Sequence, residues 1–215
     1  FEPTENFTDW STFNGDGHAS YKWILPYSSS TYSHTGTYSA QFYNGTTNTG
    51  EDWLFSRCFP FEAGKTYEIS FWYRAYSATY PQTLTLKMGS APASAAMTTT
   101  LASLVNFNNA THQQSVTRFT VPTSGSYNFG WLGLAGLTYY AYIDDINIKE
   151  IPSQEAAAIG IISPSSGCGL SNAETVTTQI LNTGGDTISG NLTAYYQANN
   201  GAIVSEAVAT NILPG

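Results

Sequence analysis

The chain has 215 residues, of which only 10% are Asp, Glu, Lys or Arg, whereas 14% are aromatic. In a typical soluble domain, charged residues make up about 25% of all residues. The formal net charge is −8, and the seven Lys and Arg residues are spread thinly along the chain. Because nucleic acids and anionic membranes are bound by clustered basic residues, this composition argues against both as partners. No apolar run approaches the roughly 20 residues that cross a bilayer, so we expect no direct membrane insertion.

The aromatic and β-branched residues favour β-strands, and their spacing indicates where the strands lie. Within residues 66–74, Tyr67, Ile69, Phe71 and Tyr73 occupy every second position, a period of two that is typical of a strand with one buried face. The same pattern predicts strands at residues 38–43, 52–57, 84–88, 115–121, 127–131 and 139–149. For residues 91–104 we expect a loop or a short helix. Seven or more strands predict a two-sheet sandwich of the jelly-roll type over residues 1–152.

The pattern changes at residues 151–154, after which Tyr195 and Tyr196 are the only aromatic residues. Short strands are expected near residues 158–162, 175–181, 192–196 and 203–209. This spacing predicts an immunoglobulin-like sandwich over residues 153–215. Such a sandwich has about seven strands, so either this one is truncated or its missing strands come from residues outside the sequence. The predicted fold class is therefore all-β, a jelly-roll sandwich followed by an immunoglobulin-like sandwich.

The two cysteines, Cys58 and Cys168, fall in different predicted domains, and their spacing matches no metal-binding motif. We therefore do not expect them to pair with each other, and Cys168 could pair with a residue beyond Gly215. The sequence opens at Phe1 without a methionine, as a mature or trimmed product does. Together with the composition, this leads us to expect a secreted or cell-surface protein.

Several segments of the first region resemble a known family in their order and spacing. Among them are Phe1-Glu2, Asn14-Gly15-Asp16-Gly17-His18, Glu51-Asp52-Trp53-Leu54-Phe55-Ser56-Arg57 and Tyr142-Ile143-Asp144-Asp145-Ile146. With them, residues 1–150 resemble the cleaved-adhesin and choice-of-anchor jelly-roll modules of Bacteroidetes surface proteins. Those modules are similar to MAM domains, to galactose-binding-like domains and to the adhesin domains of gingipain proteases. Through segments within residues 162–185, residues 153–215 resemble the N-terminal part of the immunoglobulin-like repeat that often follows such modules. The resemblance implies an extracellular bacterial protein.

An acidic residue interrupts an apolar face of the last predicted strand of the jelly roll. By alternation, Asp144 shares this face with Tyr140, Tyr142, Ile146 and Ile148, where an unpaired charge is costly unless a cation or hydrogen-bond donors meet it. The resemblance implies a structural calcium ion between the chain start and this strand, and calcium takes six to eight oxygen ligands. The expected ligands are Glu2, Asn14, Asp16, Asp52, Asp144 and Asp145.

Two observations weigh against this calcium site. Related modules tend to have Asp-Gly-Asp-Gly near the N-terminus, and Asn14 replaces the first Asp here, although its amide still offers a neutral oxygen. Alternatively, the Asp144-Asp145 pair ends at a solvated edge or meets Arg57, Arg74 or Arg118.

Aromatic side chains near strand ends and loops are candidates for contact with a sugar, because apolar ring faces suit C–H groups and Asn, Asp and Ser suit hydroxyls. The candidates are Trp10, Trp23, Trp53, Tyr76, Tyr80, Tyr139 and Tyr140. For each of them the alternative is packing in the core. Trp72 lies on a mostly polar strand face, so it is either exposed or covered by a second layer.

The sequence has no Gly-x-Ser-x-Gly elbow, phosphate-binding loop or zinc spacing, which argues against an enzyme. We expect a non-catalytic recognition or adhesion module that binds a carbohydrate or a host or matrix protein, beside neighbouring domains of a larger chain. One alternative is a purely architectural module of a larger secreted enzyme. Another is a glycoside hydrolase, which would use two carboxylates such as Glu51-Asp52 or Asp144-Asp145, although adjacent residues point to opposite faces of a strand.

Overall fold

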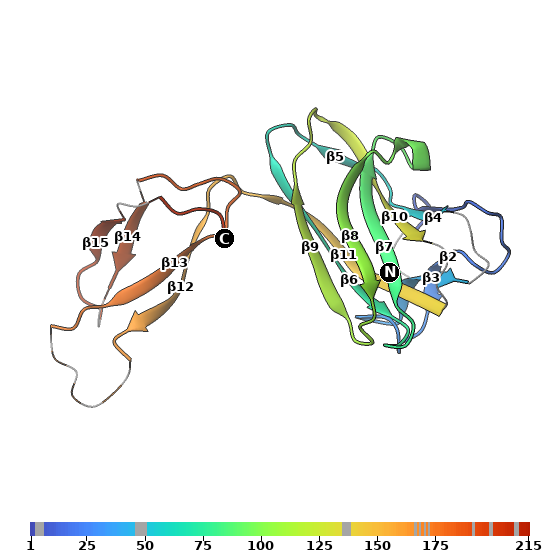
Figure 1. The fold of residues 1–215 in the computed structure, drawn as a ribbon. Helices are drawn as coiled ribbons and strands as arrows, with labels where there is room; N and C mark the ends of the chain where they lie inside the picture. The colour runs from blue at the N-terminus through green and yellow to red at the C-terminus, as the bar shows by residue number, and fades with distance from the viewer. Residues whose placement is uncertain are drawn as a thin grey trace. The chain divides into compact units, whose positions relative to one another are not determined.

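The computed structural model describes all residues except 3–6, 46–50, 135–138, 166, 168, 170, 172, 191, 198, 199, 209 and 210. The chain divides into two compact units, Phe1–Lys149 and Glu150–Gly215 (Figure 1). Both consist of antiparallel β-strands, which confirms the predicted all-β class. Among the described residues, no helix is long and apolar enough to cross a membrane.

The first unit is a sandwich of two sheets (Figure 1). In sheet order, the first sheet contains β1 (Ser11–Asn14), β4 (Glu51–Phe55), β10 (Gly125–Leu134), β7 (Gln82–Gly89) and β8 (Thr99–Phe107), and β5 (Phe59–Phe61) also pairs with β10. The second sheet contains β2 (Trp23–Ser28), β3 (Tyr38–Asn44), β11 (Tyr139–Ile151), β6 (Thr66–Ala75) and β9 (Gln113–Phe119). Strands that are distant in sequence are thus neighbours in both sheets, as in a jelly roll.

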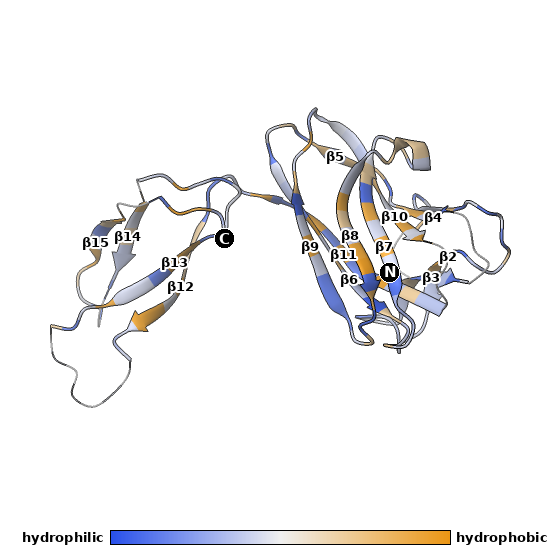
Figure 2. Ribbon diagram, viewed as in Figure 1, coloured by the Kyte–Doolittle hydropathy of each residue, from blue (hydrophilic) through white to orange (hydrophobic). Residues whose placement is uncertain are grey.

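The hydrophobic core of the first unit follows from the period of two in its strands. Ile69 and Phe71 of β6 are almost completely buried, as are Phe42 of β3, Leu54 of β4 and Trp131 of β10. In β6 the hydrophilic Glu68 and Ser70 flank Ile69. Figure 2 shows hydrophobic and hydrophilic positions following one another along several strands. Each such side chain stabilises the fold by about 1.5–3 kcal/mol relative to an exposed one, so this core fixes the register of both sheets.

Four strands were not expected from the sequence: β1, β2, β5 and β8. The loop or short helix expected over residues 91–104 is a single 3₁₀ turn, Ser94–Ala96, followed by β8. Residues of β8 pair only with β7, at the edge of the first sheet, and several of its side chains are exposed. An exposed edge strand gives a weak hydrophobic pattern, which is why β8 escaped detection.

The second unit consists of two separate two-stranded ribbons. One joins β12 (Ala156–Ser163) to β13 (Thr177–Asn182), and the other joins β14 (Leu192–Tyr196) to β15 (Val204–Val208). All four strands overlap the segments expected near residues 158–162, 175–181, 192–196 and 203–209. The immunoglobulin-like assignment of residues 153–215 stays a prediction, as does the position of the boundary after residue 152.

Candidate functional site

Four of the seven predicted ligand-contacting aromatics lie together at one end of the second sheet. Tyr139 and Tyr140 begin β11, and Tyr76 and Tyr80 follow β6 in the loop that leads to β7. The rings of Tyr80 and Tyr139 are stacked with centroids 3.9 Å apart, and the Tyr76 ring lies 5.1 Å from Tyr139 and 5.8 Å from Tyr140. The Tyr76 N–H also donates to the Tyr140 carbonyl at 2.9 Å. We call these four residues the tyrosine cluster.

Tyr139 has an unusual backbone conformation. Its φ is 78°, in the region that non-glycine residues rarely adopt. A residue held there costs on the order of 1–3 kcal/mol, and such strain occurs mainly where the position of a side chain serves a function. Here it places the Tyr139 ring against Tyr80 with 38% of the residue exposed.

Further tyrosines continue the cluster across the outer face of the second sheet. Tyr43 of β3 stacks on Tyr140 at 4.4 Å, and Tyr142 lies 6.2 Å from Tyr140 along β11. Tyr32, from the loop between β2 and β3, lies parallel to Tyr142 at 4.5 Å. The alternation that puts Tyr140 and Tyr142 on one face was visible in the sequence, whereas nothing in it indicated the contact of Tyr32.

The hydroxyl groups of Tyr139 and Tyr140 stay protonated at neutral pH. A hydrogen bond with Tyr80, and repulsion between the charges that the two hydroxyls would carry, raise the pKa of Tyr139 above the usual 10.0. Burial and the neighbouring Tyr43 raise the pKa of Tyr140. A protonated phenol both donates and accepts hydrogen bonds. Tyr139 and Tyr140 therefore offer uncharged hydroxyls beside apolar ring faces.

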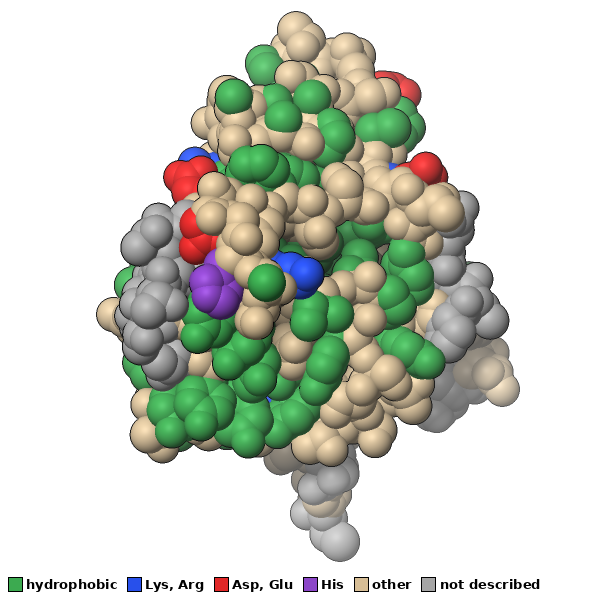
Figure 3. All heavy atoms as spheres, turned by 90° about the vertical axis from the view of Figure 1, so that its right-hand side faces the viewer, with side chains coloured by type: hydrophobic (Ala, Val, Ile, Leu, Met, Phe, Trp, Pro, Cys, Tyr) green, Lys and Arg blue, Asp and Glu red, His purple; other side chains and the backbone are tan. Residues whose placement is uncertain are grey.

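Figure 3 shows hydrophobic side chains, a class that includes tyrosine there, gathered over the lower part of one face of the molecule. One histidine and one basic side chain lie among them. Aromatic and hydrophobic side chains thus contribute to the surface of this protein as well as to its core.

Trp23 and Trp53 lie in the interior, contrary to their assignment as ligand contacts. Each is only 2% exposed, so the alternative of core packing holds for both. Trp23 stacks on Phe42 at 5.3 Å between the sheets. Trp53 belongs to a small cluster with Phe55, Met97 and Leu132. Met97 comes from the segment after the 3₁₀ turn, a contact that the strand pattern does not reveal.

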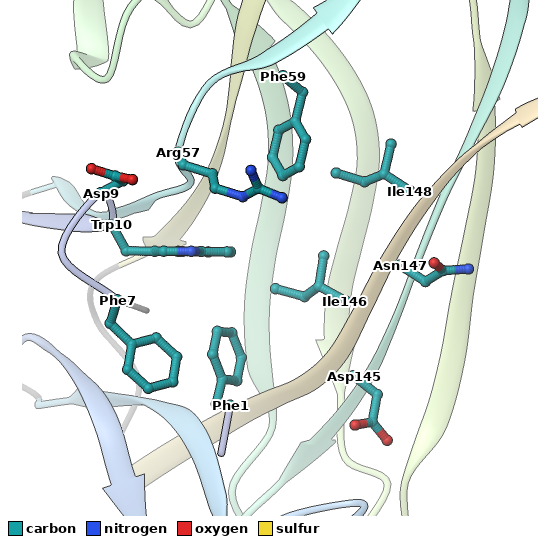
Figure 4. Close-up of a pocket in the computed structure, with 10 residues that line it drawn as sticks. All are labelled: Phe1, Phe7, Asp9, Trp10, Arg57, Phe59, Asp145, Ile146, Asn147 and Ile148. Carbon is teal, nitrogen blue, oxygen red and sulfur yellow. The ribbon is translucent and has the colours of Figure 1, made fainter. Parts of the chain in front are cut away.

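Trp10 is half-buried and lines a pocket of about 750 Å³ beside the second half of β11. In Figure 4 its ring lies between Arg57 and Phe1. The lining residues are Phe1, Phe7, Asp9, Trp10, Arg57, Phe59, Asp145, Ile146, Asn147 and Ile148. The pocket shares β11 with the tyrosine cluster but uses residues 145–148 of that strand, so Trp10 is not part of the cluster.

Three predicted calcium ligands, Glu2, Asp144 and Asp145, surround the loop between β2 and β3. Glu2 Oε1 accepts a hydrogen bond from the Thr37 N–H at 2.9 Å. The fully buried Asp144 accepts one from the His34 N–H at 2.8 Å, and Asp145 Oδ2 lies 2.6 Å from His34 Nδ1. Burial raises the pKa of Asp144, although hydrogen bonds from backbone N–H groups oppose this. The buried carboxylate is thus met by hydrogen-bond donors.

The other three predicted ligands lie at the β1–β4 end of the first sheet. Asn14 is opposite Asp52 in the β1–β4 pair, and Asp52 Oδ1 accepts a hydrogen bond from the Gly15 N–H at 3.0 Å. Asp16 Oδ1 accepts one from the His18 N–H at 2.8 Å. Across the part of the chain that the structure describes, no three His, Cys, Asp or Glu side chains come together as metal ligands would. The six expected ligands therefore do not form one site.

Of the arginines considered as alternative partners of Asp144 and Asp145, two have other contacts. Arg118 pairs with Glu68 at 3.4 Å, and Arg74 donates to the Thr31 carbonyl at 3.2 Å. The loop between β2 and β3 also covers Trp72, because the His34 ring stacks on it at 3.9 Å. Trp72 is half-buried, with one face of its ring covered by this loop, so it lies between the two alternatives that we considered.

The first unit has the jelly-roll fold of bacterial adhesin domains. In particular, the K1 cleaved adhesin domain of Lys-gingipain from Porphyromonas gingivalis W83 matches with a TM-score of 0.53 and 14% identity, over 66% of this chain and 90% of that one. The K3 domain of the same protein matches with a TM-score of 0.51 and 14% identity, over 66% and 89% of the two chains. At these identities the likeness establishes the fold alone. The sequence matches no protein-family model and no curated protein.

Proposed function

We propose that the first unit is a non-catalytic recognition module that binds an uncharged carbohydrate through the tyrosine cluster. The observation that carries this proposal is the convergence of Tyr76, Tyr80, Tyr139 and Tyr140 from two separate segments on one partly exposed site. Tyrosine supplies a large contact area at a low cost in conformational entropy. Its ring face suits the C–H face of a sugar, and its hydroxyl suits the hydroxyls of a sugar.

The adhesin fold supports the same proposal, because the similar domains are named as adhesins. A glycosidase is not supported: Asp52 and Asp144, one from each carboxylate pair considered, are fully buried. We propose accordingly that the protein acts outside the bacterial cell, as a secreted or surface-attached chain.

The test is a glycan array probed with the full chain, followed by titration calorimetry on the best ligand. Tyr139→Ala and Tyr80→Ala should each weaken binding by about two- to tenfold or more, because an aromatic stacking contact is worth about 0.5–1.5 kcal/mol beyond the area that is buried. Tyr139→Phe keeps the ring and should retain part of the affinity.

Tyr195→Ala is the matched control, because this tyrosine is 71% exposed but belongs to the second unit. It should leave the affinity unchanged. An array with no carbohydrate signal, or equal binding by the Tyr139→Ala and Tyr195→Ala variants, would refute the proposal. Binding to immobilised matrix proteins in place of glycans would indicate a host or matrix protein as the ligand.

We also propose a structural calcium ion at the loop between β2 and β3, with Glu2 and Asp144 as the carboxylate ligands. Both carboxylates accept hydrogen bonds from backbone N–H groups of this loop, so both lie beside it. Calcium at 100 times its dissociation constant would add about 2.7 kcal/mol to the stability of the unit. Thermal unfolding should therefore shift upward by several degrees between EDTA and millimolar calcium in the wild type but not in Glu2→Gln. An equal melting temperature of the wild type in both buffers would exclude the site.

A further inference from the structure

Ring contacts continue from the tyrosine cluster through Tyr43 to a pair of rings outside the proposed site. Tyr21, in the segment before β2, lies edge-on to Tyr43 with ring centroids 5.0 Å apart. The His18 ring stacks on Tyr21 at 4.0 Å, with 18° between the two planes. The contacts therefore run without a break from Tyr80 to His18. We call the connected residues the aromatic row: Tyr80, Tyr139, Tyr76, Tyr140, Tyr43, Tyr21 and His18.

The aromatic row crosses the strands of the second sheet. Tyr140 and Tyr43 are register partners in the β11–β3 pair. On one side of them the Tyr76 N–H donates to the Tyr140 carbonyl, and on the other the Tyr43 N–H donates to the Lys22 carbonyl at 3.0 Å. Because neighbouring strands lie about 4.8 Å apart, the row spans about 14 Å from Tyr76 to the segment that leads into β2. The row is therefore longer than a single sugar ring.

The loop between β2 and β3 borders the row along one side. Tyr32 of this loop lies 5.5 Å from Tyr76 and parallel to Tyr142. By alternation Tyr142 faces away from the core, yet it is only 1% exposed, because Tyr32 covers it. Tyr139 in the row is 38% exposed. A ligand can therefore follow the row but cannot contact Tyr142 beside it.

Hydrogen bonds fix the His18 end of the row. Asn14 Nδ2 donates to the His18 carbonyl at 2.8 Å, and the N–H groups of Ser20 and Tyr21 donate to His18 Nδ1 at 3.2 and 3.3 Å. Because Nδ1 is an acceptor, the neutral ring has its hydrogen on Nε2, where it can be donated to a ligand. A Cβ at Gly45 would lie 2.2 Å from Cζ of Tyr21, so glycine lets the Tyr21 ring lie against this backbone. This end thus offers a ring and a hydrogen-bond donor in a preorganised position.

We infer that the aromatic row binds an extended stretch of a linear, uncharged polysaccharide, with successive sugar units placed from Tyr139 and Tyr80 to Tyr21 and His18. This inference rests on the proposed function and names the form of the carbohydrate. Successive rings in line suit the repeating units of a chain, because each ring can pack on a C–H face and each polar group can meet a hydroxyl. A single terminal sugar would contact only one end of the row.

The experiment is titration calorimetry of the full chain with linear β-1,4-linked oligomers of glucose, galactose and xylose, each from two to six units long. In the series that binds, the six-unit oligomer should bind about tenfold or more tightly than the two-unit oligomer. The reason is that the longer chain adds contacts with Tyr43, Tyr21 and His18 to those with the tyrosine cluster.

Two variants test the far end of the row. Tyr21→Ala and His18→Ala should each weaken binding of the six-unit oligomer by about two- to tenfold and leave the two-unit affinity unchanged. The unchanged affinity for the short oligomer also shows that the variant is folded. Tyr139→Ala should weaken binding at every length, whereas the matched control Tyr195→Ala should alter none.

Equal affinity for the two-unit and six-unit oligomers would overturn the inference and leave the tyrosine cluster as a site for one or two sugars. The same loss at every length in Tyr21→Ala would also overturn it, because Tyr21 would then belong to that small site. So would a positive glycan array without binding of any linear oligomer. An array with no carbohydrate signal, by contrast, refutes the proposed function itself.

Discussion

Replacing Asp144 with alanine tests how far the stability of the first unit depends on the contact between β11 and the loop between β2 and β3. The carboxylate is fully buried. It accepts hydrogen bonds from the backbone N–H groups of His34 at 2.8 Å, Thr35 at 3.4 Å and Asp145 at 2.8 Å. The amino nitrogen of Phe1 lies 3.6 Å from it. Alanine would remove the carboxylate that accepts all of these contacts.

Two terms of opposite sign set the size of the effect. Removing one partner of a buried, hydrogen-bonded charge costs about 3–5 kcal/mol. Burial also penalises the charged carboxylate, as its raised pKa indicates, and alanine removes this penalty. We therefore expect a net loss of about 2–4 kcal/mol, which corresponds to a fall of roughly 4–16 °C in the melting temperature for a unit of this size.

Urea denaturation in EDTA, followed by tryptophan fluorescence, would measure this loss. The tryptophans, Trp10, Trp23, Trp53, Trp72 and Trp131, all lie in the first unit, so the signal reports its unfolding alone. Asp144→Asn keeps one acceptor oxygen and should fall between the wild type and Asp144→Ala. Asp9→Ala, which removes an exposed carboxylate of the same unit, should stay within about 0.5 kcal/mol of the wild type. A loss below about 1 kcal/mol for Asp144→Ala would show that these hydrogen bonds do not hold the loop.

Two other perturbations test the sandwich itself. A Cβ at Gly133 would lie 2.4 Å from Cε1 of the buried Phe42, so Gly133→Ala should destabilise the first unit by about 1–3 kcal/mol in the same urea assay. Gly125→Ala, whose Cβ would lie 3.8 Å from its nearest neighbour, should change little, and equal effects would contradict the tight packing at Gly133. Burial raises the pKa of Tyr32 and Tyr140, so the native state keeps protons that the unfolded chain loses near pH 10. The two tyrosines therefore contribute fully to the free energy of unfolding below pH 10, and this contribution is lost as the pH rises through their higher native pKa values. A urea midpoint that is equal at pH 8 and pH 11 would disprove it.

Alternation in the sequence identified the strands that have one buried and one exposed face. This pattern predicted β6 correctly, and Ile69 and Phe71 of that strand are buried in the core, but it did not predict β8. The register of β8 against β7 shifts near Leu84 and again near Leu86, which inserts extra residues into β8. Such bulges break the period of two, so the exposed position of β8 and its bulges together hide it from pattern analysis.

For the tyrosine cluster, the sequence predicted the local position of each residue but not the contacts between residues from distant segments. Tyr76, Tyr80, Tyr139 and Tyr140 were selected for their places near strand ends, but only the strand order brings the two pairs together. The prediction that Trp53 contacts a ligand was wrong, because Met97, from a segment far along the chain, packs with it in a buried cluster.

The acidic pair in β11 departs from its expected geometry for a local reason. Asp144 and Asp145 were expected on opposite faces, yet both contact His34. Asp145 has a φ of 46°, so the chain does not alternate there as a regular strand does. A sequence pattern that assumes an unbroken strand could not reveal this.

The length of β11 has a mechanical consequence. This strand of 13 residues begins with Tyr139 and Tyr140, lies between β3 and β6, and ends at Ile151, beyond the division between the two units. Tension between a ligand held at the start of the strand and the rest of the chain would run along its axis. The hydrogen bonds to its neighbours are perpendicular to that axis. They would be loaded in shear and together rather than opened one after another, a geometry suited to an attachment that must withstand pulling.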